Sequence, residues 1–162
     1  MATQNADVNV IPEAETCVFF EEQLQMDLPK EWKLMEGQPG QNLSSPAIMK
    51  VSEAKDCGVT LSIADAAVTE ETFNEVLMAQ RQVLWRVVGG YREYGMPSKK
   101  INGQTVGCIV YESNGVNNTL YNVFFITAFK EKMLVGTFFC DARDIEKWND
   151  YFPDYLESLK IL

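Results

Sequence analysis

Alternating apolar and polar residues predict β-strands in the first third of the chain. From Val18 to residue 28, apolar side chains recur at every second position with one interruption, and Pro29 ends the run. This pattern predicts one strand with a single buried face. Two short apolar runs at 47–51 and 59–63 flank a turn at 56–58, and they predict a pair of strands.

The pattern changes to a helical period near residue 69. Thr69 can cap a helix, and Glu70 and Glu71 would then stand at its positive end. The apolar residues that follow share one side of such a helix: Phe73, Val76, Leu77, Leu84 and Val87. We therefore predict a long amphipathic helix that ends at Val88.

Extended runs separated by hairpin turns follow the helix. Asn102-Gly103 is the strongest two-residue hairpin signal, because both positions must take a positive φ. Further turns at 114–115 and 130–131 complete a series of four antiparallel strands, at 91–101, 104–112, 119–129 and 132–140. The last two strands are apolar at both alternating sets of positions, so we expect them to be covered on both faces.

A second amphipathic helix closes the sequence. Its apolar residues are spaced three or four apart, and Pro153 is expected to kink or restart it; they are Ile145, Trp148, Phe152, Leu156 and Leu159. The elements predict an α+β fold, an α/β/α sandwich. Its antiparallel sheet has about six or seven strands, the long helix on one face and the C-terminal helix on the other. Residues 1–16 are expected to form a loose or disordered lead-in, and residues 17–162 a single domain.

Charge and composition narrow the function. Fourteen Lys and Arg against 23 Asp and Glu give a net charge of −9, which repels phosphate backbones and anionic lipid heads. We expect no nucleic-acid partner and no membrane insertion. The chain has no histidine, which removes Ser-His-Asp triads, Cys-His dyads and His-ligated zinc. We expect no enzyme activity, no metal ion and no cofactor.

The four cysteines carry no redox or zinc motif. Cys17, Cys57, Cys108 and Cys140 lie far apart in the sequence and form no C-x-x-C. Cys108 and Cys140 fall in predicted strands with another strand between them, which is beyond disulfide reach. Cys17 with Cys57 is the one pair left as a plausible disulfide.

Two pairs of large side chains are candidate anchors for a protein partner. Met78 and Trp85 lie seven residues apart and form a minor stripe on another side of the long helix. Tyr91 and Tyr94 belong to a half-exposed strand beside Arg92. The alternative interpretation of the first pair is the edge of a wide core contact, and that of the second is ordinary edge-strand packing.

Four carboxylates on the terminal helix form a further candidate surface. Glu146, Asp150, Asp154 and Glu157 are spaced four, four and three residues apart, which stacks them along one side of a helix. This acidic ridge is a candidate docking site for a basic partner or a weak Ca²⁺ site. The alternative is a solvated face, because no calcium-binding loop motif accompanies it.

Three short segments resemble the PsbP-like superfamily, and the similarity extends from about Val18 to Leu162. Glu31 stands where the family usually has Gly. The matching segments are Leu28-Pro29 with Trp32, Ile101-Asn102-Gly103-Gln104, and Leu156 with Ser158-Leu159-Lys160. The superfamily includes the photosystem II oxygen-evolving accessory protein, a yeast Ran-binding import factor and bacterial secretion-associated adaptor chaperones. The resemblance therefore implies the sandwich fold and non-enzymatic binding to other proteins.

The function expected from the sequence is that of a protein-binding adaptor or chaperone-like accessory protein of bacterial type. We expect it in the cytoplasm, since the opening residues have no basic start followed by an apolar stretch. One alternative is a small-ligand carrier or enzyme that uses a sheet–helix pocket with a Cys or a carboxylate. Another is an exported accessory lipoprotein whose signal is absent from this sequence.

Overall fold

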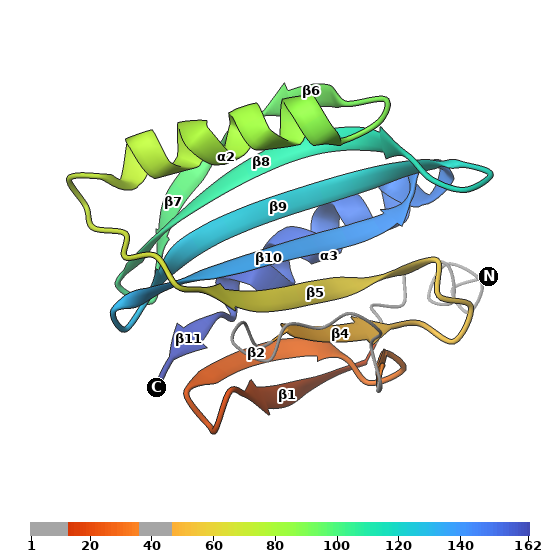
Figure 1. Ribbon diagram of the computed structural model, residues 1–162. Helices are drawn as coiled ribbons and strands as arrows, with labels where there is room; N and C mark the ends of the chain where they lie inside the picture. The colour runs from red at the N-terminus through yellow and green to blue at the C-terminus, as the bar shows by residue number, and fades with distance from the viewer. Residues whose placement is uncertain (1–12, 36–46) are drawn as a thin grey trace.

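Eight antiparallel strands form one sheet through the middle of the molecule (Figure 1). The computed structural model describes residues 13–35 and 47–162. The order is β3-β4-β5-β10-β9-β8-β6, and β7 also pairs with β8. The strands are β3 Lys33–Leu34, β4 Ala47–Val51, β5 Cys57–Ala64, β6 Arg92–Gly95, β7 Ser98–Ile101, β8 Gln104–Asn114, β9 Thr119–Phe129 and β10 Lys132–Asp141.

A second, three-stranded sheet lies beside the large one and was not predicted. It consists of β1 (Ala14–Phe19), β2 (Leu24–Pro29) and β11 (Lys160–Ile161), in the order β1-β2-β11. The prediction of one strand from residue 18 to 28 is wrong, because the chain turns back at residues 20–23 and forms a hairpin. In β1 the buried residues are Cys17 and Phe19, so Val18 points outward.

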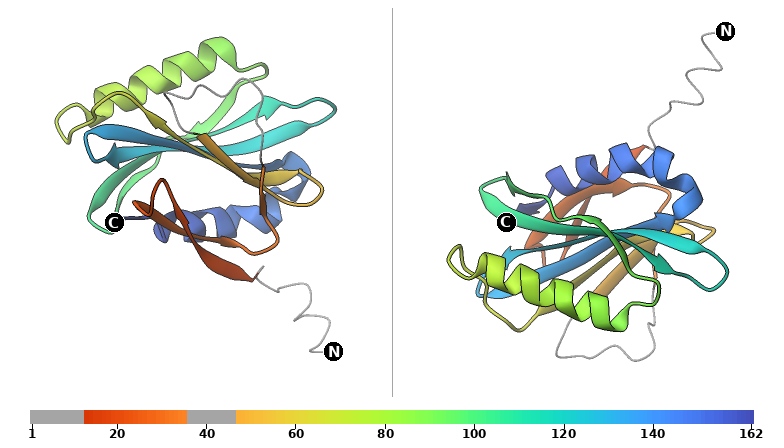
Figure 2. Two further views of the ribbon diagram at one scale, coloured as in Figure 1. Left: turned by 60° about the horizontal axis from the view of Figure 1, so that its bottom comes forward. Right: turned by 90° about the horizontal axis from the view of Figure 1, so that it is seen from above.

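Two helices cover opposite faces of the large sheet (Figure 2). Helix α2 (Phe73–Val87) covers one face alone. Helix α3 (Ile145–Glu157), preceded by the short helix η1 (Ala142–Asp144), shares the other face with the small sheet. The predicted α/β/α sandwich is confirmed, and the small sheet adds to the layer that contains α3.

The helices differ from the prediction at particular residues. Helix α2 begins at Phe73, because the Thr69 and Thr72 hydroxyl groups hydrogen-bond to each other (3.1 Å) in a turn before it. Thr72 occupies the N-cap position without a side-chain cap hydrogen bond, so the predicted cap at Thr69 is wrong. Pro153 lies inside α3, which continues without a break to Glu157.

The meander follows the turn signals with one exception. Asn102 (φ 47°) and Gly103 (φ 82°) both take positive φ, as the hairpin signal predicts. The predicted strand at 91–101 is two strands, because Met96 and Pro97 separate β6 from β7. Both short strands pair with β8.

The core is divided by the large sheet. Phe124 and Phe125 are adjacent in β9 and point to opposite faces, and both are buried. Phe124 packs beneath α2, and Phe125 packs beneath α3 and the small sheet. The expectation that these strands are covered on both sides is confirmed.

The N-terminal end of the chain is described only in part. Residues 1–12 of the expected lead-in at 1–16 lie outside the described residues, and β1 begins at Ala14. In the described ranges, no helix has the length and apolar character needed to cross a membrane.

Candidate interaction surfaces

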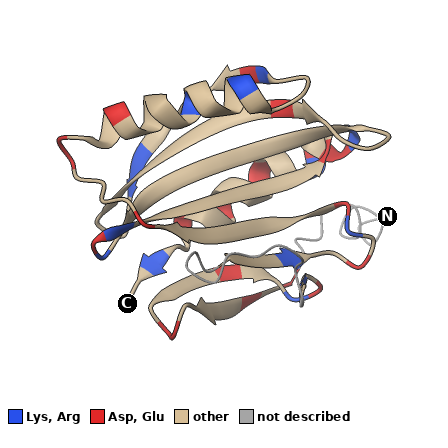
Figure 3. Ribbon diagram, in the orientation of Figure 1, with Lys and Arg blue, Asp and Glu red and all other residues tan. Residues whose placement is uncertain are grey.

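The outer side of α2 exposes large apolar side chains. Trp85 is 69% exposed and Met78 is 43% exposed, so both predicted anchor residues face solvent. Trp85 lines a hollow of about 420 Å³ together with Gln82 and Arg86. Figure 3 shows basic residues along the second half of this helix and an acidic residue near its start, and it shows acidic residues on α3.

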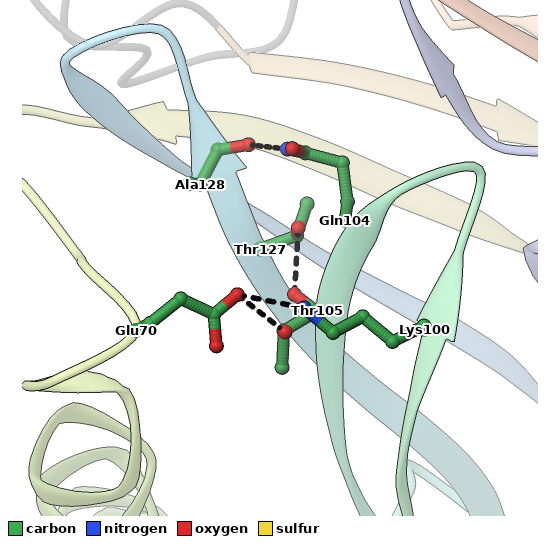
Figure 4. Close-up of polar contacts among 6 residues, drawn as sticks. All are labelled: Glu70, Lys100, Gln104, Thr105, Thr127 and Ala128. Atoms are coloured by element: carbon green, nitrogen blue, oxygen red, sulfur yellow. Dashed lines mark hydrogen bonds and ion pairs between the residues drawn. The ribbon is translucent and has the colours of Figure 1, made fainter.

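A polar network fixes the chain at the entrance to α2 (Figure 4). Glu70 Oε1 accepts hydrogen bonds from Thr105 Oγ1 (2.7 Å) and Lys100 Nζ (3.1 Å). These two contacts hold the pKa of the Glu70 carboxyl below its usual range, with the Thr105 hydroxyl contributing most. Thr127 Oγ1 in turn donates to the carbonyl oxygen of Thr105 (2.9 Å), and Gln104 Nε2 donates to that of Ala128 (2.7 Å). The residues before α2 are thereby tied to β7, β8 and β9.

A second contact fixes the middle of α2 to β6. Arg81 Nε lies 2.6 Å from Glu93 Oε1, which also accepts a hydrogen bond from the Tyr91 hydroxyl (2.8 Å). The Tyr91 and Tyr111 rings are 5.1 Å apart. Burial, followed by the neighbouring Glu93, raises the pKa of Tyr91. Tyr91 therefore serves the packing of α2 against the sheet.

Tyr94 lies on the other face of the sheet. Its hydroxyl hydrogen-bonds to Glu112, and its ring is 6.1 Å from that of Tyr121 beside α3. Tyr121 donates a hydrogen bond to Asn149 Oδ1 of α3 (3.2 Å). The structure thus places Met78 and Trp85 on one helix but separates Tyr91 from Tyr94, so the four residues do not form one surface.

The acidic ridge of α3 is a solvent-exposed row. Glu157 pairs with Lys99 Nζ (3.1 Å), whereas Glu146, Asp150 and Asp154 form no ion pair with the described part of the chain. Within residues 13–35 and 47–162, no three potential metal ligands gather into a site. The ridge contributes negative charge to this side of the molecule.

A hollow that the sequence did not reveal opens between the two sheets. It measures about 700 Å³, and Phe20, Ile63 and Phe129 provide apolar walls with charged residues of the β9–β10 turn at the rim. The Phe20 and Phe129 rings are 6.0 Å apart. The site depends on the β1–β2 hairpin, because Phe20 belongs to its turn. The sequence patterns did not predict this hollow because they did not predict the hairpin.

Cys17 and Cys57, the pair that the sequence left as a plausible disulfide, are not bonded to each other. All four thiols are free and buried. Cys17 lies in the small sheet with its Sγ 3.3 Å from Lys50 Nζ, whereas Cys57 faces Cys140 across β5 and β10. The two sheets therefore hold Cys17 and Cys57 in different surroundings.

Three of the thiols have a raised pKa. Burial is the main cause for each, and it raises the pKa of Cys57, that of Cys108 to about 11 and that of Cys140 to about 12. These three thiols are protonated at neutral pH, which makes them weak nucleophiles.

The chain resembles solved structures over nearly its whole length. No family model and no curated protein matches its sequence. Cyanobacterial PsbP from Synechocystis sp. PCC 6803 superposes with a TM-score of 0.68 and 9% identity, over 95% of each chain. The Ran-binding protein Mog1p of Saccharomyces cerevisiae gives 0.62 and 5%, over 93% of this chain and 96% of that one. LpqN of Mycobacterium tuberculosis, described as involved in cell envelope biogenesis, gives 0.51 and 11%, over 98% and 95%. The resemblance is thus confirmed at the level of the fold, which the chain shares with cyanobacterial PsbP and yeast Mog1p.

Proposed function

We propose that this protein is a non-enzymatic, protein-binding accessory protein that docks its partner on the outer side of α2. The observation that carries the proposal is the position of Trp85. The other two tryptophans, Trp32 and Trp148, are 0% and 3% exposed, whereas Trp85 is 69% exposed. An indole in water is a ready anchor, because Trp and Arg are enriched among the residues that dominate binding energy.

The surroundings of Trp85 support this role. Arg86 and Gln82 line the same hollow and supply hydrogen-bond donors beside the indole ring. Met78 adds a flexible apolar side chain on the same side of the helix. The Arg81–Glu93 contact and the Glu70 network hold α2 in place, so little ordering free energy is lost when a partner binds.

The fold comparison supports a protein partner. The yeast protein with this fold is named as Ran-binding, so the fold presents a protein-binding surface in that case. We extend this to an adaptor or chaperone-like role for the present chain. At 5% identity, the partner of the yeast protein cannot be assigned to this chain. The proposal of a protein partner therefore rests on Trp85 and Arg86.

The chemistry of the chain supports a role without catalysis. The sequence has no histidine, and the raised pKa values of Cys57, Cys108 and Cys140 disfavour thiolate nucleophiles. Four free, buried cysteines are typical of a reducing compartment, and we place the protein in the cytoplasm on that basis.

Affinity capture with matched variants tests the proposal. The bait is the wild-type chain, Trp85→Ser or Val116→Ser, and recovered proteins are quantified by mass spectrometry. Val116 is the control because it is 95% exposed in the β8–β9 turn. We expect a partner that wild type and Val116→Ser recover equally and that Trp85→Ser recovers about tenfold less, as loss of an anchor residue predicts. Equal recovery of every partner by Trp85→Ser would refute the docking surface.

The hollow between the sheets favours a second candidate function, that of a carrier for a small apolar ligand. Its volume of about 700 Å³ and its Phe20, Ile63 and Phe129 walls suit a drug-sized hydrophobic molecule. Titration with N-phenyl-1-naphthylamine, a neutral dye that fluoresces in apolar sites, checks this. We expect saturable fluorescence that Phe20→Ser abolishes and Val116→Ser preserves. Fluorescence unaffected by Phe20→Ser counts against the carrier function.

A further inference from the structure

Two cysteines lie directly opposite each other where β5 and β10 pair. Cys57 of β5 is the register partner of Cys140 of β10. Asp141 N donates to the carbonyl oxygen of Asp56 (3.2 Å) at the next position, so the cysteines form a non-hydrogen-bonded pair. The Cα atoms of such a pair lie about 4.5 Å apart, within the range of about 4.4–6.8 Å that disulfides span.

The two thiols also share a face of the sheet. Residues directly opposite in an antiparallel pair point the same way, and both cysteines belong to the core cluster beneath α3. Two thiols in this arrangement can form a bond without moving the strands. The register distinguishes this pair from Cys17, which lies in the other sheet, and from Cys108, which faces Phe125.

Cys57 has a route to solvent. It lines a hollow of about 270 Å³ beside the β4–β5 turn, together with Ser52, Asp56, Lys147 and Trp148. Cys140 does not line this hollow and is 0% exposed. A small oxidant therefore reaches Cys57 first.

We propose that Cys57 and Cys140 are an oxidation site for hydrogen peroxide, at which the two thiols form a reversible cross-strand disulfide. The proposal is independent of partner binding at Trp85.

The reaction proceeds in two balanced steps. The Cys57 sulfur attacks one peroxide oxygen, the O–O bond breaks, and the products are a sulfenic acid on Cys57 and one water. The Cys140 sulfur then attacks the Cys57 sulfur, the S–O bond breaks, and the hydroxide leaves as a second water with the Cys140 proton. Two thiols are oxidised and one peroxide is reduced to two waters. Since both thiols are protonated at neutral pH, the first step is slow compared with that at an exposed thiolate.

The disulfide would join two parts of the sheet that are distant in the sequence. β5 ends at Ala64 and β10 begins at Lys132, whereas β8, β9 and β10 follow one another through hairpins. A covalent bond at this junction restricts the unfolded chain over a long loop. We therefore expect oxidation to raise the midpoint of thermal unfolding.

Peptide mapping of the peroxide-treated wild-type chain is the first test, because it requires no variant to fold. We expect a Cys57–Cys140 linked peptide after non-reducing digestion, its loss on treatment with dithiothreitol, and a higher thermal midpoint before that reduction. The proposal is overturned if peroxide links Cys17 to Cys57, yields only sulfinic acid, or leaves Cys57 and Cys140 unlinked.

Serine variants test the order of the two steps. In Cys140→Ser, Cys57 sulfenic acid has no resolving thiol, so dimedone should label Cys57 in peroxide. In Cys57→Ser, Cys140 should stay unlabelled, since it has no route to the oxidant. Cys108→Ser is the matched control and should form the disulfide as wild type does. Dimedone labelling of Cys140 in Cys57→Ser would contradict the assigned order.

Discussion

The two faces of the large sheet are covered in different ways. In the described chain, eight buried residues form the cluster beneath α2, whereas 24 form the cluster beneath α3 and the small sheet. The Trp148 ring of α3 is stacked on the Phe152 ring, with 5.5 Å between the centroids. The Trp148 centroid also lies 5.5 Å from that of Trp32. The outer side of α2 exposes Trp85, while that of α3 carries the acidic ridge. The α3 side thus concentrates stability, and the α2 side leaves an apolar surface free for contact.

Truncating the two adjacent phenylalanines of β9 gives the largest effect and tests this contrast. Phe125→Ala should destabilise the protein by about 4 kcal/mol and Phe124→Ala by about 3 kcal/mol. Phe125 is 0% exposed, and its ring centroid lies 5.7 Å from that of Phe138. This face is covered by both α3 and the small sheet, which cannot both move in to fill the cavity left by the truncated side chain. Phe124 lies beneath a single helix that can move inward. Urea unfolding measures both values, and a larger loss in Phe124→Ala would reverse the comparison.

Added methyl groups test the same contrast by overpacking. A Cβ at Gly136 would overlap Phe125 Cζ, and one at Gly107 would lie 2.7 Å from Phe73 Cε1 of α2. We expect Gly136→Ala to lower the free energy of unfolding by about 3 kcal/mol and Gly107→Ala by about 1 kcal/mol. The cost at Gly107 is smaller because α2, the single element on that face, can shift outward to make room for the methyl group. Equal costs in thermal unfolding would show that both layers are equally rigid.

Tyr155→Phe should stabilise the α3 side. The Tyr155 hydroxyl is buried without a hydrogen-bond partner in the described structure, and burial raises its pKa. Removing an unsatisfied hydroxyl should raise the free energy of unfolding by about 1 kcal/mol. Chemical denaturation of the single variant measures the gain. A loss of stability would mean that the hydroxyl has a partner.

The pH dependence of stability should differ between Asp141, which precedes α3, and Glu70, which precedes α2. The Arg143 side chain, then Asn118, hold the pKa of Asp141 before α3 well below its usual range, and Thr105 and Lys100 do the same for Glu70 before α2. A lowered folded pKa stabilises the protein above the ordinary carboxyl pKa, and this contribution disappears as the pH falls. Asp141→Asn should therefore lower the thermal midpoint at neutral pH. At about pH 3 the midpoints of wild type and Asp141→Asn should lie closer together.

Glu70→Gln is the matched variant for the α2 side. The Glu70 side chain is more exposed than that of Asp141, so solvent screens its contacts and the change should be smaller. A larger acid effect in Glu70→Gln than in Asp141→Asn would place the stronger electrostatic anchor on the α2 side.

Local patterns predicted the sandwich because its central strands are apolar on both faces. The apolar residues at both alternating positions of β9 and β10 require cover on each face, and Phe124 and Phe125 confirm this. Asn102-Gly103 identified a hairpin because few other residues accept its backbone angles. These features depend on neighbours in sequence.

The β1–β2 hairpin could not be predicted from the same rules. Phe20, Glu21 and Glu22 all take left-handed backbone angles (φ 55°, 58° and 64°), which turn prediction assigns to Gly, Asn or Asp. The apolar alternation changes phase within this turn, so Cys17 and Phe19 face inward instead of Val18. Tertiary packing on the large sheet decides this conformation.

The candidate surface was predicted in part. Met78 and Trp85 share a side of α2 because seven residues complete two helical turns. Tyr91 and Tyr94 are an odd number of positions apart, so the alternation of an extended chain places them on opposite faces of the sheet. The Cys57–Cys140 pair required the pairing of β5 with β10, which no local pattern encodes.

The pairing of β11 with β2 sets an order of events during synthesis. Gln25 pairs with Lys160, and the Leu162 amide donates to the carbonyl oxygen of Gln23 (2.9 Å). The ribosome must release residues 160–162 before the N-terminal hairpin gains its third strand, whereas α2 and the meander emerge earlier. The aromatic surface beneath α3 likewise stays open in the nascent chain until α3 itself leaves the exit tunnel, after the meander has emerged.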